Sequence, residues 1–348
     1  MDFKNAQLWR TLLDEYNSSA AQEIRVMEVC GTHTHAIARY ALRTLLPEGV
    51  TLISGPGCPV CVSGALFIEK IRHLLRQGVT VTLFGDLLRI PGTSGTLMGE
   101  RNLRIVYSPA DALHFALENP GVKTVFAAVG FAPTLAAAAA LMAEVEELRP
   151  RNFSILSDFK EIMPVLQLLC REEKLSGLLL PGHVASITGL RHFKGLGIPG
   201  VISGFEPENI LHSLHILLKA HHAGEKDLLV NNYPDAVRDE GNIQAQKLID
   251  RYFSPENGTW RGLGNIPQSR YTLQEPYAAF DTEKIFDLSQ VQAFENPACR
   301  CGEVLTGKLQ PESCPLFGTV CTPEEPAGAC MASPEGSCAA SFKFREGN

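Results

Sequence analysis

The sequence has no run of 18 apolar residues, no excess of basic residues and no GxxxxGKS/T motif. Without such an apolar run we expect no transmembrane helix and no membrane partner, and the AAAAALMA stretch at 136–143 is typical of a buried helix. The net charge of −7 leaves no basic footprint, so we expect no nucleic-acid partner. Because the GxxxxGKS/T motif is absent, no phosphate-cradling P-loop is evident.

The first twenty residues, MDFKNAQLWRTLLDEYNSSA, contain no apolar segment of the kind that secretory signal peptides have. We therefore expect a cytoplasmic protein, in which thiols stay reduced. This matters because the chain has ten cysteines. In that compartment, clustered cysteines more often bind metal or carry out redox chemistry than form structural disulfides.

Six of the ten cysteines lie in a Gly- and Pro-rich tail that offers little apolar material for a core: Cys299, Cys301, Cys314, Cys321, Cys330 and Cys338. Four thiolates can hold a [4Fe-4S] cluster or a structural zinc ion. The spacing does not form the paired CxxC motifs of a zinc ribbon, and a purely disulfide tail would suit a secreted protein. The residue types therefore favour iron–sulfur ligation, and two of the six cysteines remain for another task.

Short apolar segments alternate with helical patterns, such as 63–76 and 161–174, along most of the chain. Strands that are apolar on both faces predict parallel sheets covered by helices, so the fold class is α/β. The predicted strands form two similar series: 25–29, 50–53, 79–84 and 103–107, then 123–129, 153–157, 177–180 and 200–202.

These two series predict two similar parallel-sheet α/β domains, at 25–120 and 121–230, as an ancient duplication would give. A small Cys-rich third domain would combine residues 1–24, an amphipathic helix, with residues 231–348. Residues 205–253 look helical, and 254–298 reads as a polar, irregular connector. Ligands bind at the carboxyl ends of parallel strands, so six Gly-containing turns are expected to line one cleft: VCGTHTH, ISGPGCP, LFGD, VGFAP, LPGHV and ISGFEP.

The first of these turns places a thiol and two imidazoles, those of Cys30, His33 and His35, within six residues. A helix N-terminus and neighbouring histidines are expected to stabilise the thiolate. Thiolate and imidazole together suit iron, zinc or copper. The structural alternative is a buried cysteine followed by two polar turn residues.

The second turn carries a CxxC motif, Cys58-Pro59-Val60-Cys61, between a strand and a helix. This position is typical of thioredoxin-type redox pairs, in which the first thiol lies at the helix N-terminus. The alternative is half of a zinc ribbon, but the chain has no second CxxC to complete it. We therefore predict redox or metal chemistry here.

Asp86, His183 and Glu206 also follow predicted strands, so their side chains are candidates for the cleft. Each acid has an alternative position as a helix N-cap or on the surface. Cys170 lies in an apolar helical pattern and reads as a small core residue.

Together these blocks resemble the HypD-type [NiFe]-hydrogenase maturation factors. The resemblance is carried by CGTHTHAIARYALR at 30–43, SGPGCPVCV at 54–62, FGDLLRIPG at 84–92, YSPADAL at 107–113, PGHVASITG at 181–189, SGFEPENIL at 203–211 and the cysteine tail. It runs nearly end to end. One block departs, because the family usually carries an acid in its GFETT block, where this chain has Gly130-Phe131-Ala132-Pro133-Thr134.

The resemblance implies a redox-active assembly scaffold rather than a conventional metabolic enzyme. Such a scaffold binds a HypC-type chaperone and holds iron while the iron acquires cyanide, from a HypE-type cyanide donor, and carbon monoxide. The implied fold is two similar α/β domains and a third with a [4Fe-4S] cluster. This architecture is similar to ferredoxin–thioredoxin reductase, in which a cluster passes electrons to a disulfide.

Carried over by position, Cys30 would hold the transient iron, with its CN and CO ligands, and His33 and His35 would shape that site. Cys58 and Cys61 match the redox-active pair of the family. The cluster ligands would be Cys299, Cys314, Cys321 and Cys338, which leaves Cys301 and Cys330 as a second thiol pair.

Building a low-spin, electron-rich Fe(II) centre needs electrons, which a low-potential cluster can supply. The sequence therefore suggests a relay from the cluster through Cys301/Cys330 and Cys58/Cys61 to iron at Cys30. Two other interpretations remain open. One is a free-standing Fe-S-dependent thiol–disulfide oxidoreductase without iron cargo. The other is a binding protein with a structural zinc module.

Overall fold

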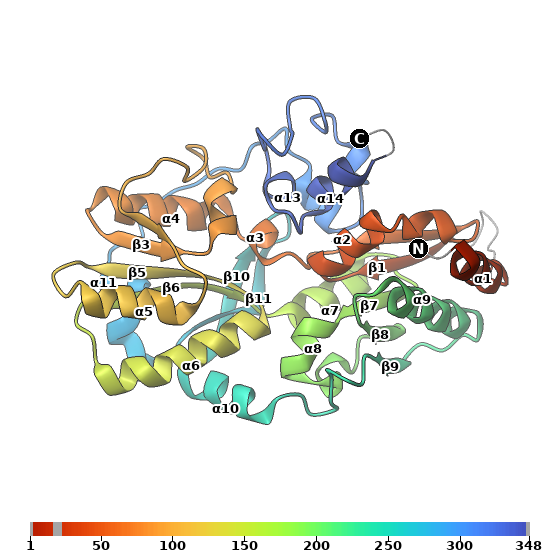
Figure 1. The fold of residues 1–348 in the computed structure, drawn as a ribbon, viewed down its shortest axis with the longest axis horizontal. Coiled ribbons are helices and arrows are strands. Elements are labelled where there is room, and N and C mark those ends of the chain that lie inside the picture. The colour runs from red at the N-terminus through yellow and green to blue at the C-terminus, as the bar shows by residue number, and fades with distance from the viewer. Residues whose placement is uncertain (1–2, 17–22, 346–348) are drawn as a thin grey trace.

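Two sheets lie side by side in this computed structural model, which describes residues 3–16 and 23–345 (Figure 1). The first sheet has five parallel strands in the order β2 (Val50–Ser54), β1 (Ile24–Glu28), β7 (Gly177–Pro181), β8 (Gly200–Ser203) and β9 (Leu229–Asn232). The second has six strands in the order β10 (Phe253–Trp260), β11 (Gly264–Leu273), β6 (Phe153–Lys160), β5 (Thr124–Gly130), β3 (Thr80–Leu83) and β4 (Leu103–Ile105).

All eight predicted strands are present, and they pair in parallel, which confirms the α/β class. Their distribution differs from the expected contiguous domains at 25–120 and 121–230. The chain builds β1 and β2 in the first sheet, β3 to β6 in the second, and then returns to the first for β7 to β9. Alternation of strands and helices predicts parallel pairing, but it carries no information on which sheet receives each strand.

The predicted irregular connector is wrong for residues 254–273, which belong to an antiparallel hairpin, β10 and β11, on the edge of the second sheet. The expected third domain differs too. Helix α1 (Phe3–Asp14) packs against α9 (Pro207–His222) of the first sheet, and α10 (Ile243–Tyr252) packs against α6 (Ala132–Leu148) of the second. Residues 17–22 of the predicted first helix lie outside the described residues.

Helices cover the sheets as parallel strands require. They are α2 (Gly31–Arg39), α3 (Pro59–Val62), α4 (Ala65–Arg76), α5 (Pro109–Glu118), α7 (Ile162–Glu172) and α8 (Gly182–Thr188), in addition to α1, α6, α9 and α10. Shorter 3-10 turns are η1 (Leu42–Leu45), η2 (Gly85–Arg89), η3 (Leu190–Phe193) and η4 (Glu275–Phe280). In the part of the chain that the structure describes, no helix has the length and hydrophobicity needed to cross a membrane.

The core follows the two-residue period of the strands. In β5, Val125, Ala127 and Val129 face a central cluster that joins both sheets and the tail, whereas Phe126 and Ala128 face an outer cluster under α5 and α6. Successive side chains of a strand point to opposite faces. Burial on both faces therefore explains why β5 reads as a continuous apolar run.

The cysteine tail lies above the junction of the two sheets (Figure 1). Its elements are α12 (Cys301–Leu305), η5 (Pro311–Ser313), α13 (Ala329–Ala332) and α14 (Ser337–Phe344), which follow α11 (Thr282–Ile285) and a loop. Cys301, Cys321, Cys330 and Cys338 are buried members of the central cluster. The tail is therefore packed onto both sheets, and α13 contacts α3 while α14 contacts α2.

Candidate functional site

A cavity of about 190 Å³ lies at the carboxyl ends of strands from both sheets. The turns after β1, β2, β5 and β7 line it, which confirms the predicted cleft for four of the six turns. The tail adds one carboxylate. The lining residues are Val29, Cys30, Thr32, Gly57, Pro59, Phe131, Pro133, Thr134, Ile162, Pro181, His183, Val184 and Glu335.

Cys30 occupies the N-cap position of α2 and lines this cavity, although only 8% of it is exposed. The turn after β2 passes so closely that a Cβ on Gly57 would lie 2.3 Å from the Cys30 backbone nitrogen. Burial, together with the charges of Glu335 and Glu28, raises the pKa of the Cys30 thiol to about 12. Backbone N–H groups of His33 and Thr32 oppose this shift, but burial outweighs them, so the expected stabilisation of the thiolate is wrong for the unliganded thiol.

His33 and His35 do not join Cys30. The buried His33 ring lies 4.8 Å from the Phe205 ring, and its Nε2 is 3.0 Å from the Gly204 carbonyl oxygen. Burial lowers the pKa of His33 to about 4, so this ring is neutral. His35 faces another cavity, where it packs edge-on against Phe344. Residues two apart on a helix point in different directions, which is why His33 and His35 separate although they are close in sequence.

Glu28 ties Cys30 to the strand beneath it. Its carboxylate accepts hydrogen bonds from Thr34 Oγ1 at 2.6 Å and from the Cys30 backbone N–H at 3.3 Å. The side chain is fully buried, and burial raises its pKa to about 7, against weaker opposing effects of its hydrogen bonds. Glu28 therefore fixes the backbone from which the Cys30 thiol projects.

Cys58 and Cys61 are joined as a disulfide across α3, and both are buried. Cys58 is the N-cap of the helix, and its sulfur accepts a hydrogen bond from the Cys61 backbone N–H at 3.2 Å. The tail packs directly on this pair. Ser333 Oγ lies 3.4 Å from Cys58 Sγ, and the Ala329 carbonyl oxygen lies 3.9 Å from Cys61 Sγ.

The six tail cysteines line a single cavity, together with apolar side chains that include Val304, Phe317 and Met331. Cys301 Sγ and Cys330 Sγ are 2.7 Å apart, so these two thiols are in contact. Hydrogen bonds with the Cys299 and Cys330 thiols, aided by the charge of Arg261, hold the pKa of Cys301 well below its usual value.

The tail residues fit a thiolate-bound cluster in two respects. Their side chains supply several sulfur ligands, and their backbone donates to one sulfur and leaves room for another. The Ala327 backbone N–H donates to Cys321 Sγ at 3.3 Å. A Cβ on Gly328 would lie 2.3 Å from Cys299 Sγ, so only glycine leaves room for that sulfur. Across residues 3–16 and 23–345, no group of three or more His, Cys, Asp or Glu side chains is placed to hold a metal ion.

Comparison with known proteins decides the family. The model of the family described as HypD: Hydrogenase formation hypA family matches residues 6–345. The chain belongs to the HypD family. It is 38% identical over 340 residues to hydrogenase maturation factor HypD of Escherichia coli, with 94% of this chain and 91% of that protein covered.

Two further relatives cover the chain almost completely. Hydrogenase maturation factor HypD of Cupriavidus necator is 35% identical over 364 residues, covering 99% of this chain and 96% of the relative. A putative hydrogenase expression/formation protein of Methanocaldococcus jannaschii is 36% identical over 356 residues, covering 99% of each. This HypD-family chain is thus matched along its whole length, cysteine tail included.

Of the weaker candidates in this HypD-family chain, His183 lines the Cys30 cavity and stacks on Phe205 at 4.1 Å. Asp86 lies instead in the second cavity, together with His35. Glu206 is at the N-cap position of α9 but makes no side-chain cap. Cys170 is half-buried on α7, and burial raises its pKa to about 11.

Sequence reasoning missed two acids of the site. Glu335 comes from the tail, lines the cavity and accepts a hydrogen bond from Thr32 Oγ1 at 3.2 Å. Nothing in its local sequence, Pro334-Glu335-Gly336, indicates a contact with a turn three hundred residues earlier. The sequence does mark Glu28 as unusual, in contrast, because it is an acid inside the largely apolar strand segment RVMEV.

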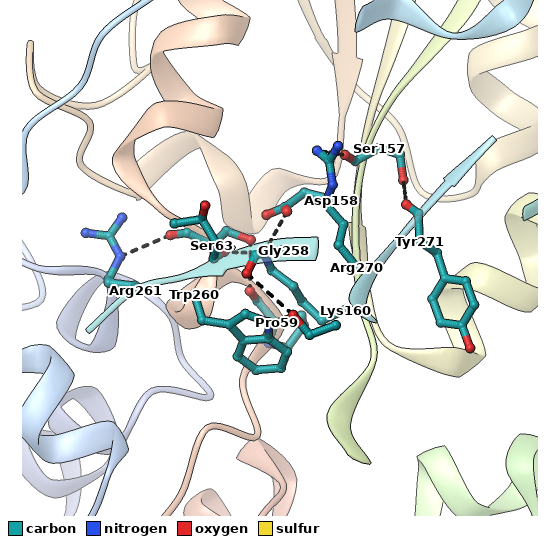
Figure 2. Close-up of polar contacts among 12 residues, drawn as sticks. Pro59, Ser63, Ser157, Asp158, Lys160, Gly258, Trp260, Arg261, Arg270 and Tyr271 are labelled. Carbon is teal, nitrogen blue, oxygen red and sulfur yellow. Dashed lines mark hydrogen bonds and ion pairs between the residues drawn. The ribbon is translucent and has the colours of Figure 1, made fainter. Parts of the chain in front are cut away.

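A buried polar network holds the hairpin beside the CxxC segment (Figure 2). Lys160 Nζ donates to Asp158 at 2.7 Å and to the Thr259 carbonyl oxygen at 2.8 Å, and it lies 5.5 Å from the centre of the Trp260 ring. Burial lowers the pKa of Lys160, and Asp158 opposes this. A buried cation is tolerated only when it is paired and hydrogen-bonded, so this network fixes β10 against β6.

We expect Glu28→Gln to change how stability depends on pH. The folded pKa of Glu28 is raised from 4.5 to about 7, so between these values the folded state keeps a proton that the unfolded chain has released. Its contribution to stability therefore falls as pH rises through this window, by about 3 kcal/mol. Urea unfolding of both proteins from pH 4 to 8 should show that difference.

The comparison uses the wild type minus the variant, so that other titrating groups cancel. Glu23→Gln, at an exposed acid just before the same strand, serves as the matched control. A wild-type minus E28Q difference that stays constant across this range would contradict the buried, protonated carboxyl.

Proposed function

We propose that this chain is a scaffold for [NiFe]-hydrogenase maturation that holds iron at Cys30 while the Fe(CN)2CO moiety is assembled. A HypC-type chaperone would share the iron, and a HypE-type partner would donate cyanide. The proposal is supported by membership of the HypD family and by the relatives' names as hydrogenase maturation factors.

The observation that carries the proposal is the contiguity of three cysteine centres. The backbone N–H of Gly31 donates to the Gly57 carbonyl oxygen at 3.3 Å, which joins the Cys30 turn to the CxxC turn. The tail then touches both, because Ser333 lies on Cys58 and Glu335 bonds to Thr32. Only four residues separate Cys330 from Glu335, so one short tail segment reaches the thiol pair, the disulfide and the cavity.

The cavity suits a thiolate-bound iron whose other ligands are small. The cavity is open to solvent, although the surrounding residues bury most of Cys30, and its wall is mostly apolar. A protein thiol must lose its proton to bind a metal. Because burial holds the Cys30 proton tightly, iron has to displace it, and Glu335, the carboxylate that lines the cavity and bonds to Thr32, is the group that would receive it.

Cys299, Cys314, Cys321 and Cys338 are the residues that would hold a [4Fe-4S] cluster, which supplies electrons one at a time when bound. The chain's own thiols would perform a balanced exchange. The Cys301/Cys330 dithiol reduces the Cys58–Cys61 disulfide, one S–S bond forms as the other breaks, and two protons move with two electrons. Contact between the tail and α3 supports exchange between these two cysteine pairs.

The test is anaerobic co-purification with a HypC-type partner, from cells that contain a HypE-type donor. We expect cyanide and carbon monoxide infrared bands, iron beyond that of the cluster, and a brown protein absorbing near ~400 nm. A complex that carries iron–sulfur absorbance but no cyanide or carbon monoxide bands would contradict the scaffold. A colourless protein that contains zinc would contradict the cluster.

A further inference from the structure

Arg261, directly after the hairpin strand β10, is a buried cation to which the proposed function assigns no role. Only 6% of it is exposed. Its backbone N–H donates to the Val62 carbonyl oxygen at 2.8 Å, and its Nε donates to the Ser63 carbonyl oxygen at 3.0 Å (Figure 2). Arg261 thus binds the two residues that directly follow Cys61.

The guanidinium group is only partly satisfied. Nη1 is paired with Glu295, which also accepts a hydrogen bond from the Ala65 backbone N–H at 2.8 Å. Nη2 is buried and has no hydrogen-bond partner among residues 3–16 and 23–345. A buried donor without a partner costs ~1–3 kcal/mol, more for a charged group, and such donors are rare in native proteins. An acceptor for Nη2 is therefore expected.

A close backbone crossing brings this donor to the tail. A Cβ on Gly262 would lie 2.1 Å from Gly302 Cα, and a Cβ on Gly302 would lie 2.5 Å from Gly262 Cα. Only two glycines permit this approach, and their neighbours in sequence are Arg261 and Cys301. Arg261 and Cys301, together with Cys299, also line one cavity of about 410 Å³.

Two pairs of the other charged side chains of that cavity are matched with each other. Lys308 pairs with Glu173 at 3.0 Å, and Arg300 pairs with Glu303. The partner of Arg261, Glu295, has 44% of its side chain exposed, so water screens its charge. The positive charge of the Arg261 guanidinium is therefore not fully neutralised on its buried side, where the cysteines lie.

We propose that Arg261 is a positioning residue for the cluster of the tail, with Nη2 donating to a sulfur on the Cys299 side. This inference rests on the proposed function, because it assigns a partner to the cluster proposed there. Cluster potentials depend on net charge and on hydrogen bonds to the sulfurs. A buried guanidinium stabilises the more negative, reduced cluster, and its anchoring on Val62 and Ser63 joins the cluster environment to the CxxC segment.

The experiment is a redox titration of the anaerobically reconstituted full chain, followed by electron paramagnetic resonance of the reduced cluster. Arg261→Gln removes the charge, and Arg261→Lys keeps it. Arg270→Gln is the matched control, because Arg270 is a largely buried guanidinium of the same hairpin that pairs with Glu256 and Glu283. Iron and sulfide are counted in every sample.

At a fixed potential, we expect R261Q to lower the ratio of reduced to oxidised cluster about tenfold, a shift of about 59 mV for one electron. R261K should lie between R261Q and the wild type, and R270Q should match the wild type. A wild-type ratio in R261Q, or an equal shift in R270Q, overturns the inference. If R261Q binds no cluster, the R261K variant tests the inference. An R261K protein that holds a cluster with a near-wild-type ratio of reduced to oxidised cluster supports the inference, and an R261K protein without a cluster overturns it. A wild type without a cluster would instead contradict the proposed function itself.

Discussion

Cys30→Ala is expected to remove the cyanide and carbon monoxide infrared bands from the complex with a HypC-type chaperone. Cys30 is the thiol that the first sheet presents to the cavity, at the N-cap of α2. Loss of even an indirect metal contact typically costs ~10–100-fold in affinity, so loss of a direct ligand should cost at least ~100-fold. Band intensity per mole of protein, with iron in excess of the cluster, measures the effect.

Two controls make this result specific. Cys170→Ala removes a half-buried thiol on α7 that lies outside the cavity, and it should keep the bands. His35→Ala should keep them too, because His35 faces the cavity that contains Asp86 rather than the one that contains Cys30. The tail should keep its iron–sulfur absorbance in all three variants.

A Cys30→Ala protein that still carries the bands would contradict the scaffold. The remaining interpretation would then be a free-standing Fe-S-dependent thiol–disulfide oxidoreductase, which needs the tail and the Cys58–Cys61 disulfide but has no use for Cys30. The family alone does not separate these outcomes, because neither the match nor the names of the relatives assign a role to any residue.

Local pattern was enough to find the strands but not the sheets. Each strand is marked by its own apolar run, as in β5, whose seven residues are all buried. The assignment of strands to sheets depends on crossovers between distant segments, such as the pairing of β1 with β7. The hairpin was missed for another reason. One face of β10 is exposed, and Pro255 and Gly258 are poor strand formers, so its sequence looks irregular.

The same division holds in the site. Cys30 and the CxxC motif were found because the carboxyl ends of parallel strands meet at one edge of a sheet. The raised pKa of Cys30 was missed because it depends on burial by Gly57 and on Glu335, both distant in sequence. The divergence of His33 and His35 was predictable, since the helix expected after the strand already separates residues two apart.

The second large effect is expected from the double variant Cys301→Ala/Cys330→Ala, which removes the thiol pair of the tail, on the elements α12 and α13. Their sulfurs are 2.7 Å apart. The carbonyl oxygen of Ala329, the residue before Cys330, contacts Cys61 Sγ. A cluster delivers one electron at a time, whereas reduction of a disulfide needs two, so the cluster must deliver electrons twice, and the Cys301/Cys330 pair can hold both as a dithiol until it exchanges with Cys58–Cys61.

We expect the double variant to reduce the Cys58–Cys61 disulfide no faster than wild-type protein without its cluster. Anaerobic protein is treated with dithionite, samples are quenched with a thiol-alkylating reagent, and mass spectrometry follows the loss of the disulfide. Cluster-free wild type gives the rate of direct reduction, and Cys170→Ala controls for the loss of a thiol elsewhere. Iron and sulfide counts establish that the double variant keeps its cluster, since Cys299, Cys314, Cys321 and Cys338 are unchanged.

A double variant that keeps its cluster and reduces the disulfide at the wild-type rate would contradict the relay. Electrons would then reach Cys58 and Cys61 by another path, and the contacts of Ser333 with Cys58 and of the Ala329 carbonyl oxygen with Cys61 are links from the tail that remain. Single variants locate the attacking thiol. If Cys330 attacks, Cys301→Ala still forms a mixed disulfide between Cys330 and α3, because the resolving thiol is missing, and Cys330→Ala does not.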